Sequence, residues 1–507
     1  MKHFFLFIML FSIFPACADD ARRRLELNEQ YQALDYSFKT PMIILDPFER
    51  TPLTALLRFK TSQPARITLT VAGRDNAKEL THTFQDKKSE HEIPVLGLYP
   101  DHNNRVTLTA EYDDGSSEKS EIQIRTHKVP KRALFVTEQK NDHETRYHFL
   151  HDGIVFDEDG WMRFSFKNDG QIVYWFNGNL IAEDRNSGLT RYSMSGEFLQ
   201  HYPFPKDFVS FAHGIAQKPN GNFLVIGSFS GKKAVIANEE QPTQREFVIE
   251  LDYKTGKHLN TIDLANILNP DRSVIIKSAT RDYGLNDWCH INSVDYDSSD
   301  KSIVVSCRHV GIIKVDETTH QLTWVVSMHQ GFDKSGRNGT GPNLREKLLT
   351  ALDKNGKILP ISVQKGVTAS TDFKWPAKTH HAKVLGNNLF SVFDNAGSLY
   401  DTNIITTPTS NASVYKIDPD QKTIQRIWSH SLPWISESAS SVLYRPDLNE
   451  VIVYASTVKD KNQTGISYGK LIRYDLTTHK PLFEATVYRG GETYFYRVDD
   501  FMFYVNK

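Results

Sequence analysis

The sequence predicts an all-β protein in which a small N-terminal β-sandwich precedes a β-propeller of five or six blades. Residues 25–130 contain short alternating apolar runs that recur about every 10 to 15 residues, with Gly, Asp, Asn and Pro between them, as in a small sandwich. From residue 132 to residue 507, two hairpin patterns alternate along the chain. Two antiparallel hairpins make a four-stranded sheet, which is the unit of a propeller blade.

The two hairpin patterns differ in how they begin. Copies of the first pattern start with a polar residue, which is histidine in most of them: His151, His213, His290, His380 and Ser440. Copies of the second pattern carry an aspartate at the start of the turn, where its side chain can accept backbone N–H bonds: Asp252, Asp316, Asp418 and Asp475. Between hairpins, residues 343–352 predict one short helix capped by Asn343 on a rim of the propeller.

The first twenty residues predict a secretory signal peptide. A start with Lys2 and His3 precedes an apolar run from Phe4 to Phe14, which is too short to span a bilayer. The residues before Cys17 resemble a lipoprotein processing site, so lipidation of Cys17 and ordinary cleavage nearby both remain open. We expect an exported, periplasmic protein, tethered to the outer membrane if Cys17 is lipidated. A formal net charge of −1 gives no reason to expect a nucleic-acid partner.

The hairpin from Asp287 to Asp316 contains the most informative pair of residues. If its turn centres near Ser299, His290 lies opposite Arg308, and opposed residues share a face of the sheet about 5 Å apart. An arginine and a potentially cationic histidine this close repel one another unless they share an anion. The pair therefore predicts half of an oxyanion-binding site. In the same register Cys289 and Cys307 are diagonal neighbours about 7 Å apart, and we expect free thiols, with a disulfide as the alternative.

Equivalent positions in successive blades converge on the propeller axis. The histidines His213, His290 and His380 should therefore meet there, with Arg308 beside them. Structural histidines at strand starts are one alternative. Three imidazoles would also suit zinc, but an adjacent arginine disfavours a cation.

Three segments resemble bacterial arylsulfate sulfotransferases of the PAPS-independent type: HGIAQKPNGNFLVIG, DWCHINSVDYDSSDKSIVVSCRHVGIIKVD and THHAKVLGNNLFSVFDN. The most specific matches are Asp287, Trp288, His290, Asn292, Ser293 and Arg308, followed by His380, Ala382 and residues 393–395. One departure is that no cysteine follows Cys307, so the small disulfide loop of that family is absent or held differently.

The resemblance implies a six-bladed propeller in which a central histidine takes the sulfuryl group from an aryl sulfate and passes it to a phenol. By motif this nucleophile is His380, with the neighbouring His381 as the lesser candidate. The resemblance assigns His213, His290 and Arg308 to the same site, and we expect Asp394 or Asn395 to lie opposite His380 and fix its tautomer. No cofactor and no metal are implied.

The partners implied are small aryl sulfates and phenols, and a homodimer is left open. Aromatic candidates for the substrate walls are Trp375, Trp434, Tyr494 and Tyr496. The alternatives from other classes are a non-catalytic exported propeller that binds an anionic ligand and a metal-dependent propeller hydrolase.

Overall fold

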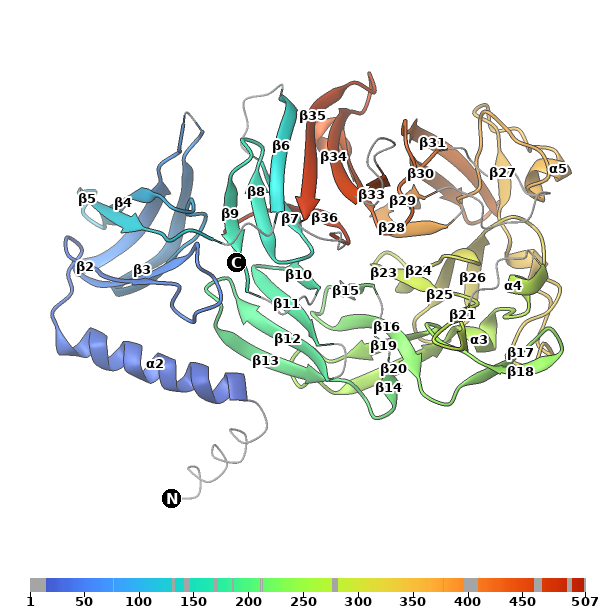
Figure 1. Cartoon of the computed structure of the whole chain (residues 1–507), viewed down its shortest axis with the longest axis horizontal. Coiled ribbons are helices and arrows are strands. Elements are labelled where there is room, and N and C mark those ends of the chain that lie inside the picture. The colour runs from blue at the N-terminus through green and yellow to red at the C-terminus, as the bar shows by residue number, and fades with distance from the viewer. Residues whose placement is uncertain are drawn as a thin grey trace.

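The computed structural model describes residues 15–75, 77–129, 133–140, 146–167, 172–184, 187–209, 211, 213–275, 281–376, 378–395, 409–459, 467–489 and 495–505. Strands dominate this part of the chain, as predicted (Figure 1). In these residues, no helix combines the length and the apolar character that a membrane span requires.

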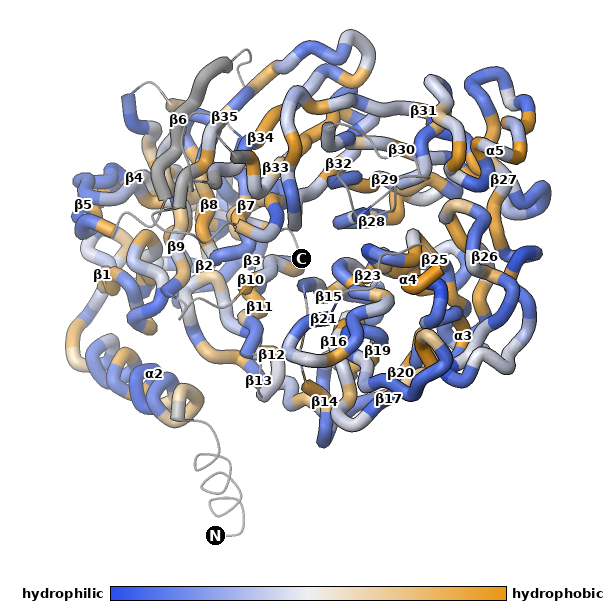
Figure 2. Tube along the Cα trace, turned by 45° about the vertical axis from the view of Figure 1, so that its right-hand side comes forward, coloured by the Kyte–Doolittle hydropathy of each residue, from blue (hydrophilic) through white to orange (hydrophobic). Residues whose placement is uncertain are grey.

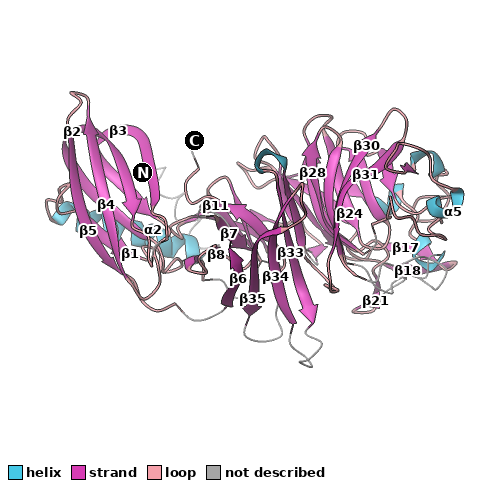
Figure 3. Cartoon of the chain, turned by 90° about the horizontal axis from the view of Figure 1, so that it is seen from above, coloured by secondary structure: helices cyan, strands magenta, loops and turns pink. Residues whose placement is uncertain are grey.

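The N-terminal domain is a β-sheet of five described strands. These are β1 (Met42–Leu45), β2 (Ala55–Val71), β3 (Leu80–Val95), β4 (Asn103–Tyr112) and β5 (Ser117–Arg125). Hydrogen bonds connect all five, because β2 and β3 each merge two predicted runs across a register shift after Lys60. The strands enclose one hydrophobic core. The strands form a layer of their own beside the rest of the molecule (Figure 3).

Helix α2 (Pro15–Ala33) docks on this domain and on the strand β13 (Phe198–Pro203). The buried carboxylate of Asp20 accepts hydrogen bonds from Arg50 at 2.8 Å and from the backbone N–H of Phe198 at 2.6 Å. Arg24 adds an ion pair with Glu197. Helix α2 thus begins inside the predicted signal region of residues 1–20, and its contacts fix it to the folded body. Residues 1–14 of that region lie outside the described residues.

Within the described ranges, the other long strands form six mainly antiparallel sheets. The first has β7 (Tyr147–Leu150), β8 (Ile154–Asp157), β9 (Met162–Ser165) and β36 (Val498–Phe501), and the second has β10 (Val173–Phe176), β11 (Asn179–Asp184), β12 (Gly188–Ser193) and β13. The third has β14 (Phe208–Val209), β15 (Ile215–Gln217), β16 (Phe223–Phe229), β19 (Phe247–Leu251) and β20 (His258–Asp263). The fourth has β23 (Ile291–Asp297), β24 (Ser302–Cys307), β25 (Gly311–Asp316) and β26 (Leu322–Val326).

The last two sheets have five strands each. The fifth has β27 (Thr350–Leu352), β28 (Thr379–Gly386), β29 (Leu389–Asp394), β30 (Asn411–Asp418) and β31 (Thr423–Ser431). The sixth has β32 (Ser441–Arg445), β33 (Glu450–Lys459), β34 (Ser467–Asp475), β35 (Pro481–Arg489) and β6 (Ala133–Lys140). Short elements lie between them: β17 (Lys233–Ile236), β18 (Glu239–Pro242), α3 (Leu264–Ile267), α4 (Arg272–Ile275), β21 (Arg281–Asp282), β22 (Leu285–Asn286), η1 (Arg345–Lys347), α5 (Ile361–Gln364) and η2 (Pro446–Leu448).

Each sheet packs on the next through a hydrophobic cluster. In Figure 2 many of the hydrophobic (orange) stretches of the chain lie within the labelled strands. One such cluster joins the third sheet to the fourth, and others continue from the fourth to the fifth and from the fifth to the sixth. The sixth sheet then packs on the first, where Leu150 and Phe156 contact the group that contains Ile452 and Leu471. Since further clusters join the first sheet to the second and the second to the third, the six sheets form a closed ring.

The ring is closed by strands from the beginning and the end of the chain segment that forms the six sheets. The C-terminal strand β36 pairs with β7, and β6 pairs with the outer edge of β35. The alternation of two hairpin patterns is thus confirmed in the third to sixth sheets, but the copy that starts at His151 is not an inner hairpin. His151 lies between β7 and β8, and the inner position of that sheet is taken by β36.

The predicted helix over residues 343–352 is wrong. Asn343 does accept a hydrogen bond from the backbone N–H of Arg345 at 2.8 Å, but only the short turn η1 follows. The chain then extends as β27, because its backbone groups pair in parallel with β31. The aspartate turns are as predicted, and Asp316, for example, accepts N–H bonds from Thr318 and Thr319.

A buried ion-pair network connects the sixth sheet to the first, where the ring closes. This closing joint can be tested by mutation. Arg473 on β34, fully buried, donates to Glu158 of the first sheet at 2.9 Å and to Glu450 at 2.6 Å. We expect Arg473→Met to lower the free energy of unfolding by about 3 to 5 kcal/mol, because the fully buried carboxylate of Glu158 loses its guanidinium partner.

Urea denaturation followed by circular dichroism measures this loss. The exposed pair of Lys233 and Glu240 provides the control, since Lys233→Met should change the free energy by less than about 1 kcal/mol. Equal small effects of the two variants would contradict the role of Arg473 at the joint.

Candidate active site

Aromatic and imidazole rings from four sheets meet at the centre of the ring. The ring centroids of His213 and His290 are 5.7 Å apart, those of His213 and Tyr496 5.2 Å, and those of His380 and Tyr496 6.2 Å. The predicted convergence of the three histidines is therefore observed, and Tyr496 lies between two of them.

The backbone turns sharply where two of these rings enter the centre. His213 has φ of +65° and His290 has φ of +50°, in the left-handed region that non-glycine residues seldom adopt. His290 directly precedes β23, and Gly214 alone separates His213 from β15. Backbone strain of this kind concentrates at functional sites, where the surrounding structure holds it in place.

The register of the central hairpin places His290 beside Arg308, as predicted. Ile291 pairs with Cys307, and the backbone N–H of Arg308 donates to the carbonyl of His290 at 3.1 Å. At the far end Asp297 pairs with Ser302, so the turn is shifted from the position expected for that pairing. A β-bulge at Asn292 absorbs the shift, which keeps His290 and Arg308 together.

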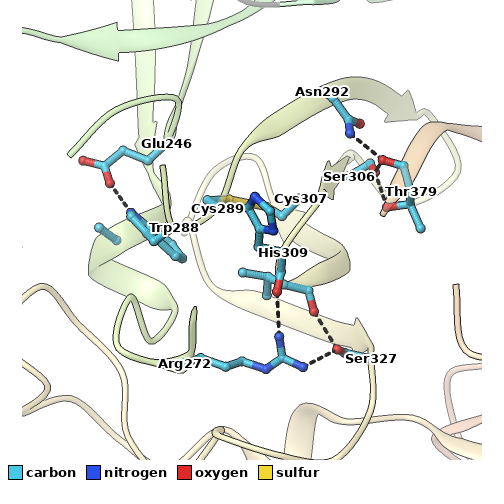
Figure 4. Close-up of a disulfide and its surroundings, with 12 residues drawn as sticks. Glu246, Arg272, Trp288, Cys289, Asn292, Ser306, Cys307, His309, Ser327 and Thr379 are labelled. Atoms are coloured by element: carbon cyan, nitrogen blue, oxygen red, sulfur yellow. Dashed lines mark hydrogen bonds between the residues drawn. A yellow bond between two sulfur atoms is a disulfide. The ribbon is translucent and has the colours of Figure 1, made fainter. Parts of the chain in front are cut away.

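A disulfide joins Cys289 to Cys307, contrary to the prediction of two free thiols (Figure 4). Their Cα atoms are 5.1 Å apart, within the range that a disulfide can bridge. The prediction failed because Cys289 precedes β23 and the chain bends at His290, so the diagonal spacing of regular strands does not apply. The bridge thus connects the residue before His290 to the residue before Arg308.

A carboxylate holds the His290 ring. Asp287 Oδ2 lies 2.5 Å from His290 Nδ1 and accepts from Arg245 Nη1 at 2.8 Å. Burial raises the pKa of Asp287, but the hydrogen bond from His290 and the charges of His290 and Arg245 outweigh it and leave the pKa lowered. Since a carboxylate accepts, Nδ1 of His290 carries a proton.

An amide holds the His380 ring. His380 Nδ1 lies 2.6 Å from Asn395 Oδ1, and Asn395 Nδ2 donates to the carbonyl oxygens of Ser436 at 2.8 Å and Ala439 at 3.2 Å. Because Nδ2 is committed to two carbonyls, Oδ1 must accept, so Nδ1 of His380 carries the proton. The lone pair of the neutral ring is then at Nε2.

The strand register differs here from the prediction that Asp394 or Asn395 lies opposite His380. Phe393 pairs with His380, and Asp394 pairs with Thr379, because two irregularities follow His380 along β28. Asn395 still reaches His380 through its side chain.

Burial and positive charge keep the imidazoles of His213, His309 and His380 neutral by lowering their pKa values. Burial, the charge of Arg308 and the charge of His290 lower the pKa of His380 well below 6.5. The pKa of His213 falls in the same direction through burial, His290 and Arg245, and that of His309 falls to about 3 through burial, His290 and Arg308. The centre thus combines neutral imidazoles with guanidinium groups, an environment that stabilises an anion.

Several residues of the site were missed or only partly anticipated from sequence. Arg497 Nη2 and the Tyr496 hydroxyl both donate to the carbonyl of Asn292, at 2.5 Å and 3.2 Å. Tyr496 was named as an aromatic candidate, whereas Arg245, His309 and Arg497 were not predicted. The sequence signal for Tyr496 and Arg497 would have been a C-terminal strand assigned to the first sheet.

The other aromatic candidates lie elsewhere. Trp375 and Trp434 belong to the hydrophobic clusters around the fifth sheet, and Tyr494 lies outside the described residues. In the part of the chain that the structure describes, no group of three or more His, Cys, Asp or Glu side chains is placed to hold a metal ion.

Family models match almost the whole chain. The model described as arylsulfotransferase (ASST) matches residues 118–497, and the arylsulfotransferase Ig-like domain matches residues 42–127. The chain belongs to the arylsulfotransferase family. The site described above lies inside the first match, and the N-terminal sheet corresponds to the Ig-like domain.

Two curated relatives agree with this assignment. Arylsulfate sulfotransferase AssT of Escherichia coli O6:H1 is 21% identical over 88% of this chain and 90% of its own length. The arylsulfate sulfotransferase AssT of Lelliottia amnigena is also 21% identical, over 88% and 90%. Among solved structures, apo AztD from Citrobacter koseri is similar with 10% identity and a TM-score of 0.26, over 86% of this chain and 98% of that one, which is too low to carry an argument.

The disulfide of this arylsulfotransferase gives a test of how the site is held. We expect the double variant Cys289→Ala/Cys307→Ala to lose about 10-fold in kcat for transfer from an aryl sulfate, because His290 and Arg308 lose their covalent brace. The rate is measured at a temperature where circular dichroism shows a folded protein, since losing the bridge costs about 3 kcal/mol of stability. Cys17→Ala is the matched control, and an unchanged rate in the double variant would contradict the brace.

The contact of Asn395 gives a second test. Asn395→Leu should lower kcat by roughly 100-fold with little change in KM, because His380 loses the acceptor that fixes its tautomer. Asp394→Asn, at the neighbouring position that sequence could not distinguish, should have a much smaller effect. The reverse order of the two effects, from steady-state kinetics, would show that the assignment is wrong.

Proposed function

We propose that this protein transfers a sulfuryl group from an aryl sulfate to a phenol without PAPS, by a ping-pong reaction through a sulfohistidine on His380. The observation that carries the proposal is the hydrogen bond from His380 Nδ1 to Asn395, which leaves a lone pair at Nε2 of a buried, neutral ring beside Arg308. Membership of the arylsulfotransferase family supports the same chemistry.

In the first half-reaction, Nε2 of His380 attacks the sulfur of the aryl sulfate. The N–S bond forms while the bond from sulfur to the aryl oxygen breaks, and the phenolate leaves and is protonated. Negative charge spreads over the sulfuryl oxygens in such loose transition states. Arg308 and His290 are the donors to these oxygens, and each preorganised donor can lower the barrier by about 3 kcal/mol.

In the second half-reaction, the acceptor phenol attacks the sulfur of the sulfohistidine. The new S–O bond forms as the N–S bond breaks, which returns His380 to its neutral state. His213 takes the phenolic proton or donates to the sulfuryl group, since its neutral ring carries one N–H and one unprotonated nitrogen. Dividing the transfer in two lets one site serve donor and acceptor in turn.

The arrangement of the six sheets supports a β-propeller, which is the architecture expected for a sulfuryl transferase of this family. Six sheets joined by successive clusters favour a six-bladed propeller, with the inner strands around the transfer site. For its location we propose export to the periplasm through the signal at residues 1–20. Lipidation of Cys17 would then tether the protein to the outer membrane.

Mass spectrometry tests the covalent step. Protein quenched after mixing with 4-nitrophenyl sulfate should carry one sulfuryl group on His380, and the group should be lost when phenol is added. His380→Ala should lose the label and the transfer activity, whereas His381→Ala should keep the label.

The release of 4-nitrophenol with and without added phenol completes this test. Release that depends on the acceptor identifies a transferase. Full transfer by His380→Ala, or release that is the same without phenol, would contradict the proposal.

The pKa of His380 predicts an unusual pH profile. Because burial and Arg308 lower this pKa, the nucleophile stays neutral in mild acid. The pre-steady-state burst of 4-nitrophenol should change by less than about 2-fold between pH 7 and pH 5.5, whereas an imidazole of ordinary pKa would lose about 10-fold. Stopped-flow measurement decides this, and a tenfold fall over that range would mean that His380 titrates normally.

A further inference from the structure

A cavity, called the second or far cavity below, lies near the centre of the ring. It is distinct from the site formed by His213, His290, Arg308 and His380, which is called the transfer site. It has a volume of about 420 Å³ and is lined by residues of five sheets, among them His151, Tyr174, Ile215, Tyr296, Lys383 and Arg497. His213, His290, Arg308 and His380 are not part of its lining. The consecutive residues His380 and His381 therefore serve different spaces, since His381 lines the second cavity.

The carbonyl of Asn292 separates the two spaces. It accepts hydrogen bonds from the Tyr496 hydroxyl at 3.2 Å and from Arg497 Nη2 at 2.5 Å. Tyr496 stacks on His213 in the transfer site, whereas Arg497 lines the second cavity. The guanidinium of Arg497 thus contacts the carbonyl of Asn292 that separates the two spaces, and it lines the second cavity.

Arg497 has no carboxylate partner among the described residues. Its side chain is buried, with 5% of the residue exposed, and its Nε makes no hydrogen bond within that part of the chain. The other charged groups of the cavity are paired: Lys383 with Asp295 at 3.1 Å, His151 with Asp499 at 2.7 Å, and Lys218 with Glu250 and Glu317 at 3.0 Å and 2.7 Å. A buried, unneutralised guanidinium is costly unless an anion binds to it.

His381 adds a neutral donor to the same cavity. Its Nδ1 accepts the backbone N–H of Val442 at 3.2 Å, so the proton of the neutral ring is on Nε2. Burial and the charge of Arg497 lower the pKa of His381 well below its usual range, which favours this neutral form. An N–H group next to an arginine suits an anionic oxygen.

Part of the remaining wall is apolar, interleaved with polar side chains. Tyr174, Phe176, Ile215, Val294 and Tyr296 offer ring and aliphatic surface opposite the charged groups. The volume falls within the range of small-molecule sites, of about 300 to 1,000 Å³, and exceeds the size of a bare sulfate ion. The lining therefore fits an arene that carries one anionic group.

We propose that this far cavity is a second binding site, which takes a small aromatic anion such as an aryl sulfonate, aryl sulfate or aromatic carboxylate. The anionic group lies on Arg497 and His381, and the ring lies against Tyr174 and Tyr296. The proposal does not depend on sulfuryl transfer, because the cavity holds none of the residues assigned to that reaction.

Isothermal titration calorimetry with benzenesulfonate tests the second site, since this probe has no aryl–oxygen–sulfur bond to transfer. The wild-type protein should bind two molecules with dissociation constants of about 1 mM or below. Ser298 is an exposed residue at the cavity, and Ser298→Trp should block it, reduce the stoichiometry to one and leave transfer from 4-nitrophenyl sulfate to phenol unchanged within about 2-fold.

Two further variants separate the sites. Arg497→Gln should weaken the second binding event by at least about 10-fold, whereas His380→Ala should retain it even if the proposed transfer chemistry is wrong. Benzyl alcohol, which has the ring without the charge, should not occupy the far cavity. No binding in the wild type, or binding events that all persist in both Ser298→Trp and Arg497→Gln, would overturn the proposal. A single event that these two variants abolish and His380→Ala keeps would support the far cavity and count against the transfer site instead.

Discussion

Closure of the ring by β36 is the constraint on which the centre of the molecule depends. The strand comes from the C-terminal end of the chain and pairs with β7, and a hydrophobic cluster and the buried Arg473 network hold the sixth sheet against the first. Only this closure brings Tyr496 and Arg497 to Asn292. The transfer site and the far cavity therefore share a partition that does not exist until the ring has closed.

The two central histidines that face Arg308 are held by different oxygen acceptors, and this difference sets the electrostatics of the centre. His290 and His380 both present an Nδ1 proton to an oxygen, but the partner is the carboxylate of Asp287 in one case and the amide of Asn395 in the other. A carboxylate can share the positive charge of an imidazolium, whereas an amide cannot. This difference fits the roles proposed for His290 as a donor to negative charge and for His380 as a neutral nucleophile, although the two residues occupy similar places in successive sheets.

Much of this arrangement could be predicted from sequence where local patterns dominate. Alternating hairpins and the pairing of His290 with Arg308 follow from apolar periodicity and turn residues, and both are observed. The pairing of His290 with Arg308 depended on a turn position that the structure does not have. The turn is shifted, and only the bulge at Asn292 restores the register. The family resemblance, carried by the residues around His290 and His380, added the chemistry that periodicity alone could not supply.

The failures have a common physical cause, which is that tertiary pairing overrides local preference. Residues 350–352 have helix-forming neighbours but extend because β31 offers an edge. Cys289 reaches Cys307 because the bend at His290 removes it from regular strand spacing. The choice between Asp394 and Asn395 depended on irregularities of β28 that leave no mark in the sequence, and the inner role of β36 required knowledge of how the ring closes.

We propose that the axis binds the sulfuryl group between Arg308, His290 and His380, and a crystal structure of the protein with a non-transferable aryl sulfonate is the decisive measurement. We expect sulfonate oxygens within hydrogen-bond distance of Arg308 and His290, with His380 Nε2 facing the sulfur on the side opposite the aryl group. A sulfonate bound with its sulfur away from His380, or a centre that stays without ligand at saturating concentration, would contradict it.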